Sequence, residues 1–140
     1  MYDKELYEKA LEACELSHAP YSMIMVGAAA LLEDGTVVKG ANFENIASPT
    51  CICAEQSLIC TLNNLYNGKK IMSIAIAAKS SNNIIDISPC GTCRQTILER
   101  QYLQKNFISI IFRYESELVA IDSIDKLLPY AFKKLSLKTK

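Results

Sequence analysis

The sequence lacks the features that mark membrane, secreted and nucleic-acid-binding proteins. No apolar run approaches the 18 residues that a membrane-spanning helix needs. The first residues, MYDKELYEKALEAC, are charged throughout and have no apolar core, so they do not indicate a signal peptide. The 15 Lys and Arg residues balance the 15 Asp and Glu residues, so the surplus of positive charge that grips phosphate backbones is missing. We therefore expect neither a membrane nor a nucleic acid as partner.

The chain also has no internal repeat, low-complexity block or Pro/Gly-rich linker. Its 140 residues fit one domain, which we expect to cover residues 1–134, with residues 135–140 as a basic tail. A domain of this size can bury about 68–70% of its unfolded surface, so it needs no disulfide scaffold. Six cysteines without a secretory signal favour a reducing compartment, and we expect a cytoplasmic protein. Clustered cysteines there favour metal binding or catalysis over disulfides.

Hydrophobic periodicity predicts helices and strands in alternation. The expected fold class is α/β, a three-layer α-β-α sandwich around a five-stranded mixed sheet, with helices on both faces. The Asp34-Gly35 pair is a hairpin signal between the first two strands. The predicted helices cover residues 3–17, 53–66 and 88–103, and a last one runs from Ser123 to near Pro129. The predicted strands cover residues 23–32, 37–43, 71–80, 107–112 and 117–121.

Two of these predicted helices begin with cysteine motifs, CICAEQ and SPCGTCRQ. In the second motif Ser88 is the expected helix cap and Pro89 the first-turn proline. A right-handed crossover between parallel strands would bring both helix starts to the same end of the sheet. The fold prediction therefore places the two cysteine motifs next to each other.

The residue types in these motifs suit a catalytic zinc. Cys90 and Cys93 are three residues apart and share one face of a helical turn, and Cys53 opens the other helix. Three thiolates would bind Zn²⁺ and leave its fourth tetrahedral position open, which is typical of catalytic sites, where zinc ionises water near neutral pH. Glu55 would lie beside the metal without binding it, suited to moving protons. The positive ends of both helices, with Arg94, would offset the thiolate charge.

Each cysteine motif alone is a weak signal, since a lone Cys-x-x-Cys also occurs in redox pairs, but together at two helix starts they favour zinc. Cys51 precedes its helix, and we expect it to pack near the site, with zinc ligation as the alternative. Cys14 and Cys60 fall in apolar helical patterns, which favours the core. His18, the single histidine, lies in a loop and is expected to be structural.

Taken in order, the motifs APYS, VGAA, NFEN, CICAEQ, SPCGTCRQ and LLPYAF resemble the small homotetrameric zinc-dependent cytidine deaminases over nearly the whole chain. The resemblance implies hydrolytic deamination of cytidine and deoxycytidine to uridine and deoxyuridine in pyrimidine salvage. It implies Zn²⁺ as the cofactor and a homotetramer as the assembly, with Glu55 as the proton shuttle. By this resemblance the metal ligands are Cys53, Cys90 and Cys93, and the substrate contacts are Asn42, Glu44, Ala54, Ile24 and Phe132, of which Phe132 would reach a neighbouring subunit.

Three positions depart from the family pattern. The family commonly has Arg at position 56, an aromatic residue at position 24 and Tyr at position 48, where this chain has Gln56, Ile24 and Ser48. The change at position 56 removes one positive charge, and we expect a more negative metal site and a raised pKa for water bound there. The other two changes alter the expected shape of the substrate pocket.

Three other functions remain open at this point. One is an aminohydrolase for a modified cytosine nucleoside such as blasticidin S, against which the NFEN motif favours an ordinary ribose. Another is a zinc-binding module without activity, which would have no use for Glu55. The third is a nucleic-acid editor, which the neutral charge and the lack of a basic, aromatic stripe disfavour.

Overall fold

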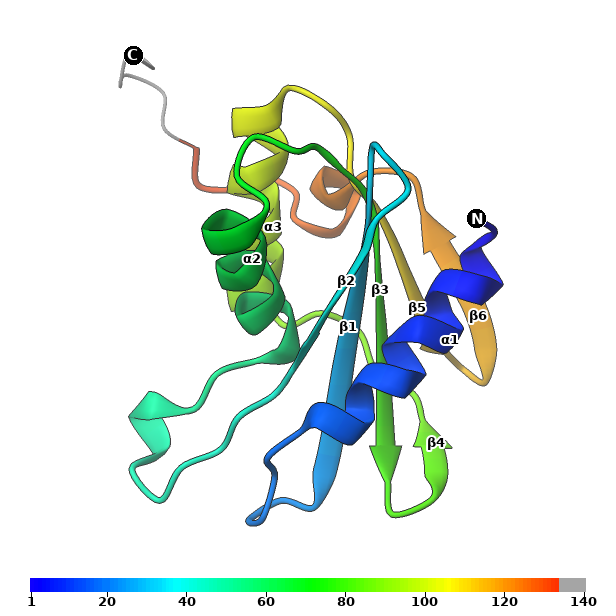
Figure 1. Ribbon diagram of the computed structural model, residues 1–140, viewed down its shortest axis with the longest axis vertical. Coiled ribbons are helices and arrows are strands. Elements are labelled where there is room, and N and C mark those ends of the chain that lie inside the picture. Colours follow the sequence, from blue (N-terminus) through cyan, green and yellow to red (C-terminus); the bar gives the residue numbers. More distant parts are fainter. Residues whose placement is uncertain (134–140) are drawn as a thin grey trace.

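The computed structural model describes residues 1–133 (Figure 1). The expected basic tail, residues 135–140, lies outside this range. Most predicted helices and strands are present within two residues of their expected ends. The observed elements are α1 (Asp3–Ala13), β1 (Ile24–Leu32), β2 (Val37–Ala41), α2 (Ala54–Leu65), β3 (Ile71–Ser80), β4 (Asn83–Ile85), α3 (Gly91–Gln104), β5 (Ser109–Tyr114) and β6 (Glu117–Ile121), with 3₁₀ turns at Cys14–Leu16, Ser48–Thr50 and Ile124–Leu127.

The strands form one mixed sheet in the order β2-β1-β3-β5-β6. Strands β3 and β5 are parallel, and every other pair in the described sheet is antiparallel. The α/β class and the mixed sheet are thus confirmed, but the sheet has six strands where five were predicted. The extra strand, β4, has three residues that pair with the end of β3. It is too short to show an alternating pattern in the sequence.

The helices cover both faces of the sheet, α1 on one side and α2 with α3 on the other (Figure 1). Successive side chains of strand β3 point to opposite faces of the sheet, so the strand contributes to the core on both sides. Ile74 and Ile76 are buried in the cluster under α2 and α3, whereas Ala75 and Ala77 are buried under α1. Small residues on the α1 side allow that helix to lie close to the sheet, and the larger isoleucines fill the space below the paired helices.

Three predicted helices differ from the structure. The first was predicted to reach residue 17, but α1 ends at Ala13 and is followed by the 3₁₀ turn Cys14–Leu16. Helix α3 begins at Gly91 with Cys90 in the extended N-cap position, so Ser88 does not cap it. The residue before a proline avoids helical geometry, which keeps Ser88 extended and delays the helix. The predicted C-terminal helix is only the 3₁₀ turn Ile124–Leu127. Pro129 lacks the N–H group that would continue the helical hydrogen bonding.

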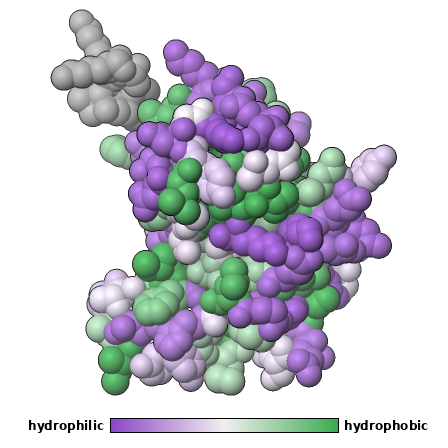
Figure 2. Space-filling model, viewed as in Figure 1, coloured by the Kyte–Doolittle hydropathy of each residue, from purple (hydrophilic) through white to green (hydrophobic). Residues whose placement is uncertain are grey.

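Apolar side chains also reach the surface. On the face shown in Figure 2, green hydrophobic residues are interspersed with purple polar ones. The β2–α2 loop contributes Phe43, Ile46 and Ile52, which are 47%, 85% and 41% exposed. Among the helices of the described chain, none is both long enough and apolar enough to cross a bilayer.

Helix α2 is seated directly on strand β2 because position 40 has no side chain. A Cβ atom added to Gly40 would lie 2.6 Å from Leu58 N, 2.8 Å from Leu58 Cα and 2.9 Å from Ala54 O. These are all backbone atoms of α2, so they cannot move without moving the helix. The close contact fixes the first turn of α2, which carries Glu55.

We predict that Gly40→Ala lowers the free energy of unfolding by about 1–3 kcal/mol, because the added methyl group forces α2 away from β2. Thermal or denaturant unfolding measures the change. Gly91→Ala is the matched control, since a Cβ there meets nothing within 4 Å and alanine suits a helix better than glycine. Equal unfolding free energies for Gly40→Ala and Gly91→Ala would contradict the packing argument.

Candidate active site

The starts of α2 and α3 carry the three cysteines that the sequence singles out. Cys53 and Cys90 are the N-cap residues of these two helices, both in extended backbone geometry. Cys93 lies in the first turn of α3 and is fully buried. The predicted convergence of the two helix N-termini is therefore present, and it places three thiols from distant parts of the chain together.

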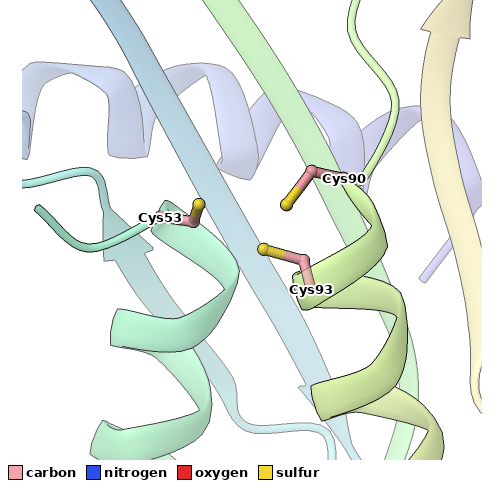
Figure 3. Close-up of side chains that lie close together, drawn as sticks. All are labelled: Cys53, Cys90 and Cys93. Atoms are coloured by element: carbon pink, nitrogen blue, oxygen red, sulfur yellow. The ribbon is translucent and has the colours of Figure 1, made fainter. Parts of the chain in front are cut away.

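The sulfur atoms of Cys53, Cys90 and Cys93 all lie within 4.8 Å of one another. Figure 3 shows the three side chains pointing toward a common centre from the two helices. Zinc bonds to sulfur at about 2.3 Å, so tetrahedral thiolates lie about 3.8 Å apart. Separations of at most 4.8 Å are compatible with this value, and the all-thiol donor set suits zinc. The site therefore fits the metal that the sequence predicts.

The electrostatics of the cluster call for a cation. Burial raises the pKa of the Cys53 thiol, and burial together with the negative charge of Glu55 raises the pKa of the Cys93 thiol. Burial also acts on Cys90, but hydrogen bonds from the backbone and thiol of Cys93 outweigh it and lower the pKa of Cys90. Without a metal, two of the three sulfurs thus favour the protonated form. A divalent cation would reverse this preference.

Glu55 lies beside the cluster in the first turn of α2. Its side chain is only 4% exposed, and burial raises the pKa of its carboxyl group. A carboxyl group with a raised pKa can accept and release a proton nearer to neutral pH than an exposed one. Its location thus suits the predicted proton-shuttling role.

The cysteine cluster and Glu55 border a cavity of about 270 Å³. Asn42, Glu44 and Ala54 line the same cavity, so the structure brings most of the predicted substrate contacts to the metal end. The lining also includes residues that the sequence patterns do not single out. Apolar residues in strands and loops resemble core positions, and so no signal marks them: Val26, Phe43, Ile52 and Ile87. Cys51, which the sequence predicts to pack near the site, and Ser88, the expected helix cap, line the cavity as well.

Two predicted substrate contacts lie outside this lining. Ile24 begins β1 and is 38% exposed, and Val26, two residues further along, faces the cavity in its place. Phe132 is 84% exposed, and its carbonyl accepts a hydrogen bond from Gln95 at 3.0 Å. Neither side chain is part of the cavity that one chain forms.

Arg94 was expected to offset the thiolate charge, but its guanidinium group hydrogen-bonds to two backbone carbonyls instead. Its Nε donates to the Pro89 carbonyl at 2.7 Å, and its other guanidinium nitrogen donates to the Leu127 carbonyl at 2.9 Å. It thereby ties the loop before Cys90 to the last 3₁₀ turn. The backbone of Cys93, in the first turn of α3, instead supplies a hydrogen bond that helps to lower the pKa of Cys90.

The remaining cysteines and the histidine have separate locations. The Cys51 thiol contacts the backbone of Asn45, 3.4 Å from its nitrogen and 3.7 Å from its oxygen, which agrees with a packing role near the site. Cys14 is buried as predicted, but Cys60 is exposed and its predicted core location is wrong. It lies on the outer side of α2. The His18 ring stacks on Phe43 with centroids 5.0 Å apart.

Residues 1–108 match the family described as the cytidine and deoxycytidylate deaminase zinc-binding region. A cytidine deaminase of Mycobacterium tuberculosis is 39% identical over 90 residues, which are 64% of this chain and 65% of that protein. One from Sporosarcina psychrophila is 32% identical over 135 residues, covering 96% of this chain and 93% of that protein. The crystal structure of a cytidine deaminase from Burkholderia pseudomallei superposes with a TM-score of 0.77 at 34% identity, covering 94% and 100% of the two chains.

The fold and the site together define a three-layer α/β protein in which three thiols between two helix N-termini could hold a metal ion. The family match over residues 1–108 and the similarity to the Sporosarcina protein over nearly the full length of both chains agree with this class. The chain belongs to the cytidine and deoxycytidylate deaminase family.

We predict that the purified protein holds one zinc ion per chain. Cys93→Ser should weaken zinc binding by more than the roughly 10–100-fold that loss of an outer-shell partner costs, since it removes a ligand. Elemental analysis and competition with a chelator measure content and affinity. Cys60→Ser is the matched control, because this exposed thiol lies on α2 outside the cluster. Equal zinc affinity in the two variants would refute the assignment.

The buried Glu55 also predicts a pH dependence for the metal-free protein. Its pKa is raised in the folded state, while the unfolded chain titrates near the ordinary value of about 4.3. The unfolded state therefore loses this proton first, and the free energy of unfolding falls as pH rises from about 4.3 through the folded pKa. The contribution is fully present only below that window.

Glu55→Gln keeps the shape and removes the ionisation. We expect the metal-free variant to be more stable than the wild type at pH 7, and the difference to shrink toward pH 4. Denaturant unfolding of both proteins between pH 4 and pH 7 measures the two profiles, and the difference between them cancels the contribution of the thiols that both proteins share. Glu99→Gln, an exposed position on α3, should leave the wild-type profile unchanged. Parallel profiles for wild type and Glu55→Gln would contradict the expectation.

Proposed function

We propose that this chain catalyses the zinc-dependent hydrolytic deamination of cytidine and deoxycytidine, giving uridine and deoxyuridine with release of ammonia. The observation that carries the proposal is the buried Glu55 carboxyl group beside the three-thiol cluster, in a cavity that also contains Asn42 and Glu44. The family relatives named cytidine deaminase support the same reaction.

Cys53, Cys90 and Cys93 would hold the zinc ion, which when bound lowers the pKa of water toward neutrality. Glu55 lies in the same cavity, and its raised pKa suits a group that both accepts and donates protons. It would take the two protons of the attacking water in turn, delivering one to N3 of the pyrimidine and the other to the departing amine. Water thus replaces the amine at C4, and the carboxylate is regenerated when ammonia leaves.

The remaining cavity residues would bind and orient the nucleoside. Ala54 would offer its backbone to the base, and the apolar side chains of Val26, Ile52 and Ile87 would exclude water from it. Asn42 and Glu44 would hydrogen-bond the sugar hydroxyls. This polar pair supports cytidine as the substrate over a modified cytosine nucleoside such as blasticidin S.

The charge of the cavity further supports a nucleoside over a nucleotide. Among the described residues that line it, none is Lys or Arg, and two are glutamates, Glu44 and Glu55. Hydrogen bonds from the hydroxyl and N–H groups of Ser22, and from the N–H group of Tyr21, lower the pKa of Glu44 and keep it charged. A phosphate group close to this carboxylate would be repelled, and no cation of the lining would neutralise it.

Assembly and cellular role complete the proposal. The 84% exposed Phe132 supports a homotetramer in which this side chain reaches the cavity of a neighbouring subunit. The nucleoside substrate supports a place in pyrimidine salvage, in the cytoplasm. In this homotetramer Ser48, which lies in a 3₁₀ turn and does not line the cavity, would contribute to a subunit contact.

The direct test is deamination of cytidine and deoxycytidine by the zinc-loaded protein, followed as loss of nucleoside absorbance. Glu55→Gln should lower kcat by at least roughly 10²–10⁴-fold while zinc content stays near one per chain, because it removes the proton carrier without removing a ligand. Glu99→Gln should keep wild-type activity. No turnover by zinc-loaded wild type, or full activity in Glu55→Gln, would refute the function.

The charge argument makes a separate prediction for the nucleotide. Cytidine 5′-monophosphate should be deaminated with a kcat/KM at least about a hundredfold below that of cytidine, equivalent to about 2.7 kcal/mol of transition-state binding. Initial rates on both compounds in the same buffer measure the ratio. Similar kcat/KM values for the two would show that the carboxylate of Glu44 does not face the phosphate-bearing end.

A further inference from the structure

The side-chain amide of Asn42 is held by three hydrogen bonds within the protein. Its Oδ1 accepts from the Ser17 hydroxyl at 2.5 Å and from the Val26 N–H group at 2.9 Å. Its Nδ2 donates to the Ile24 carbonyl at 3.0 Å. A backbone N–H group can only donate and a carbonyl can only accept, so the Val26 and Ile24 contacts fix which end of the amide is the oxygen.

Ser17 completes this arrangement by using the second lone pair of the amide oxygen. An amide oxygen has two acceptor sites, and the Val26 N–H group and the Ser17 hydroxyl fill both. Asn42 can therefore offer the cavity only the second hydrogen of Nδ2, as a donor. Hydrogen bonds accepted by the oxygen polarise the amide and strengthen that remaining N–H donor.

Glu44 complements Asn42, because its carboxylate can act only as a hydrogen-bond acceptor. Its Oε1 accepts from the N–H groups of Tyr21 and Ser22, at 3.1 and 3.0 Å. The Ser22 hydroxyl also hydrogen-bonds to this carboxylate. Because a carboxylate has about four acceptor sites, Glu44 keeps a free acceptor site for a ligand. Asn42 and Glu44 line the same cavity and together offer one donor and one acceptor. A sugar hydroxyl, which both accepts and donates, matches such a pair.

Both side chains are held by one stretch of chain, residues 17–22 between α1 and β1. The backbone of this stretch also hydrogen-bonds to the backbone of residues 42–44. The His18 N–H group donates to the Asn42 carbonyl at 3.0 Å, and the Glu44 N–H group donates to the His18 carbonyl at 2.7 Å. Ser17 precedes this bridge. It does not line the cavity, and so it acts on a ligand only through Asn42.

We propose that Ser17 is a positioning residue for sugar recognition, which saturates the oxygen of Asn42 so that this side chain meets a sugar hydroxyl purely as a donor. The proposal rests on the proposed nucleoside-binding function. It assigns a role to the connection between α1 and β1, which neither the metal centre nor Glu55 requires.

The test is equilibrium dialysis of the zinc-loaded full chain with two nucleosides, the product uridine and its analogue 2′,3′-dideoxyuridine, which lacks the 2′ and 3′ hydroxyl groups. Ser17→Ala should raise the Kd for uridine roughly fivefold, the effect of one hydrogen bond, and change the Kd for the dideoxy compound less than twofold. Ser17→Thr, which keeps the hydroxyl group, should restore uridine binding. Ser109→Ala, a half-buried serine on β5, should bind both ligands as the wild type does.

Equal weakening of both ligands by Ser17→Ala would show a general structural effect and overturn the proposal. Unchanged uridine binding in Ser17→Ala would overturn it as well. Cytidine turnover by the same preparations separates the two claims. An active wild type with Ser17-independent uridine binding refutes only the role of Ser17. An inactive wild type with Ser17-dependent uridine binding supports that role and refutes the proposed reaction.

Discussion

The site depends on the convergence of two helix N-termini at one end of a mixed sheet. Parallel pairing of β3 with β5, and the seating of α2 on Gly40, bring Cys53 and Cys90 into facing cap positions. Helix N-termini carry partial positive charge and free N–H groups, so they can hold buried sulfur at lower free-energy cost than other parts of a fold. Burial favours the protonated form of Cys53 and Cys93, so the three sulfurs ionise together only when a cation binds between them. This coupling connects the fold to the metal.

A second constraint operates at the sugar end of the cavity. Asn42 and Glu44 spend most of their hydrogen-bonding capacity on the protein itself, on Ser17, Val26 and the backbone of residues 21–22. What they have left is one donor and one acceptor. The protein therefore holds its polar contacts rigid before a ligand binds, which lowers the ordering cost of recognition.

The sequence was sufficient for the features that depend on local pattern. The periodicity of α1 and β3, the Asp34-Gly35 turn and the two cysteine motifs predicted the layers and the joining of Cys53 with Cys90 and Cys93. Features set by tertiary packing were not predictable in this way. The three-residue β4 has no pattern of its own, the hydrogen bonds of Arg94 depend on the distant Leu127 carbonyl, and Cys60 follows an apolar spacing yet faces outward.

The coordination of zinc in the intact protein tests the central claim most directly. X-ray absorption at the zinc edge counts the sulfur neighbours of the metal, which bond at about 2.3 Å. Our account predicts three sulfur neighbours in the wild type and in Cys51→Ser, because Cys51 is engaged by Asn45, and two in Cys93→Ser. Four sulfur neighbours in the wild type, falling to three in Cys51→Ser, would close the open position and contradict a catalytic metal at this site.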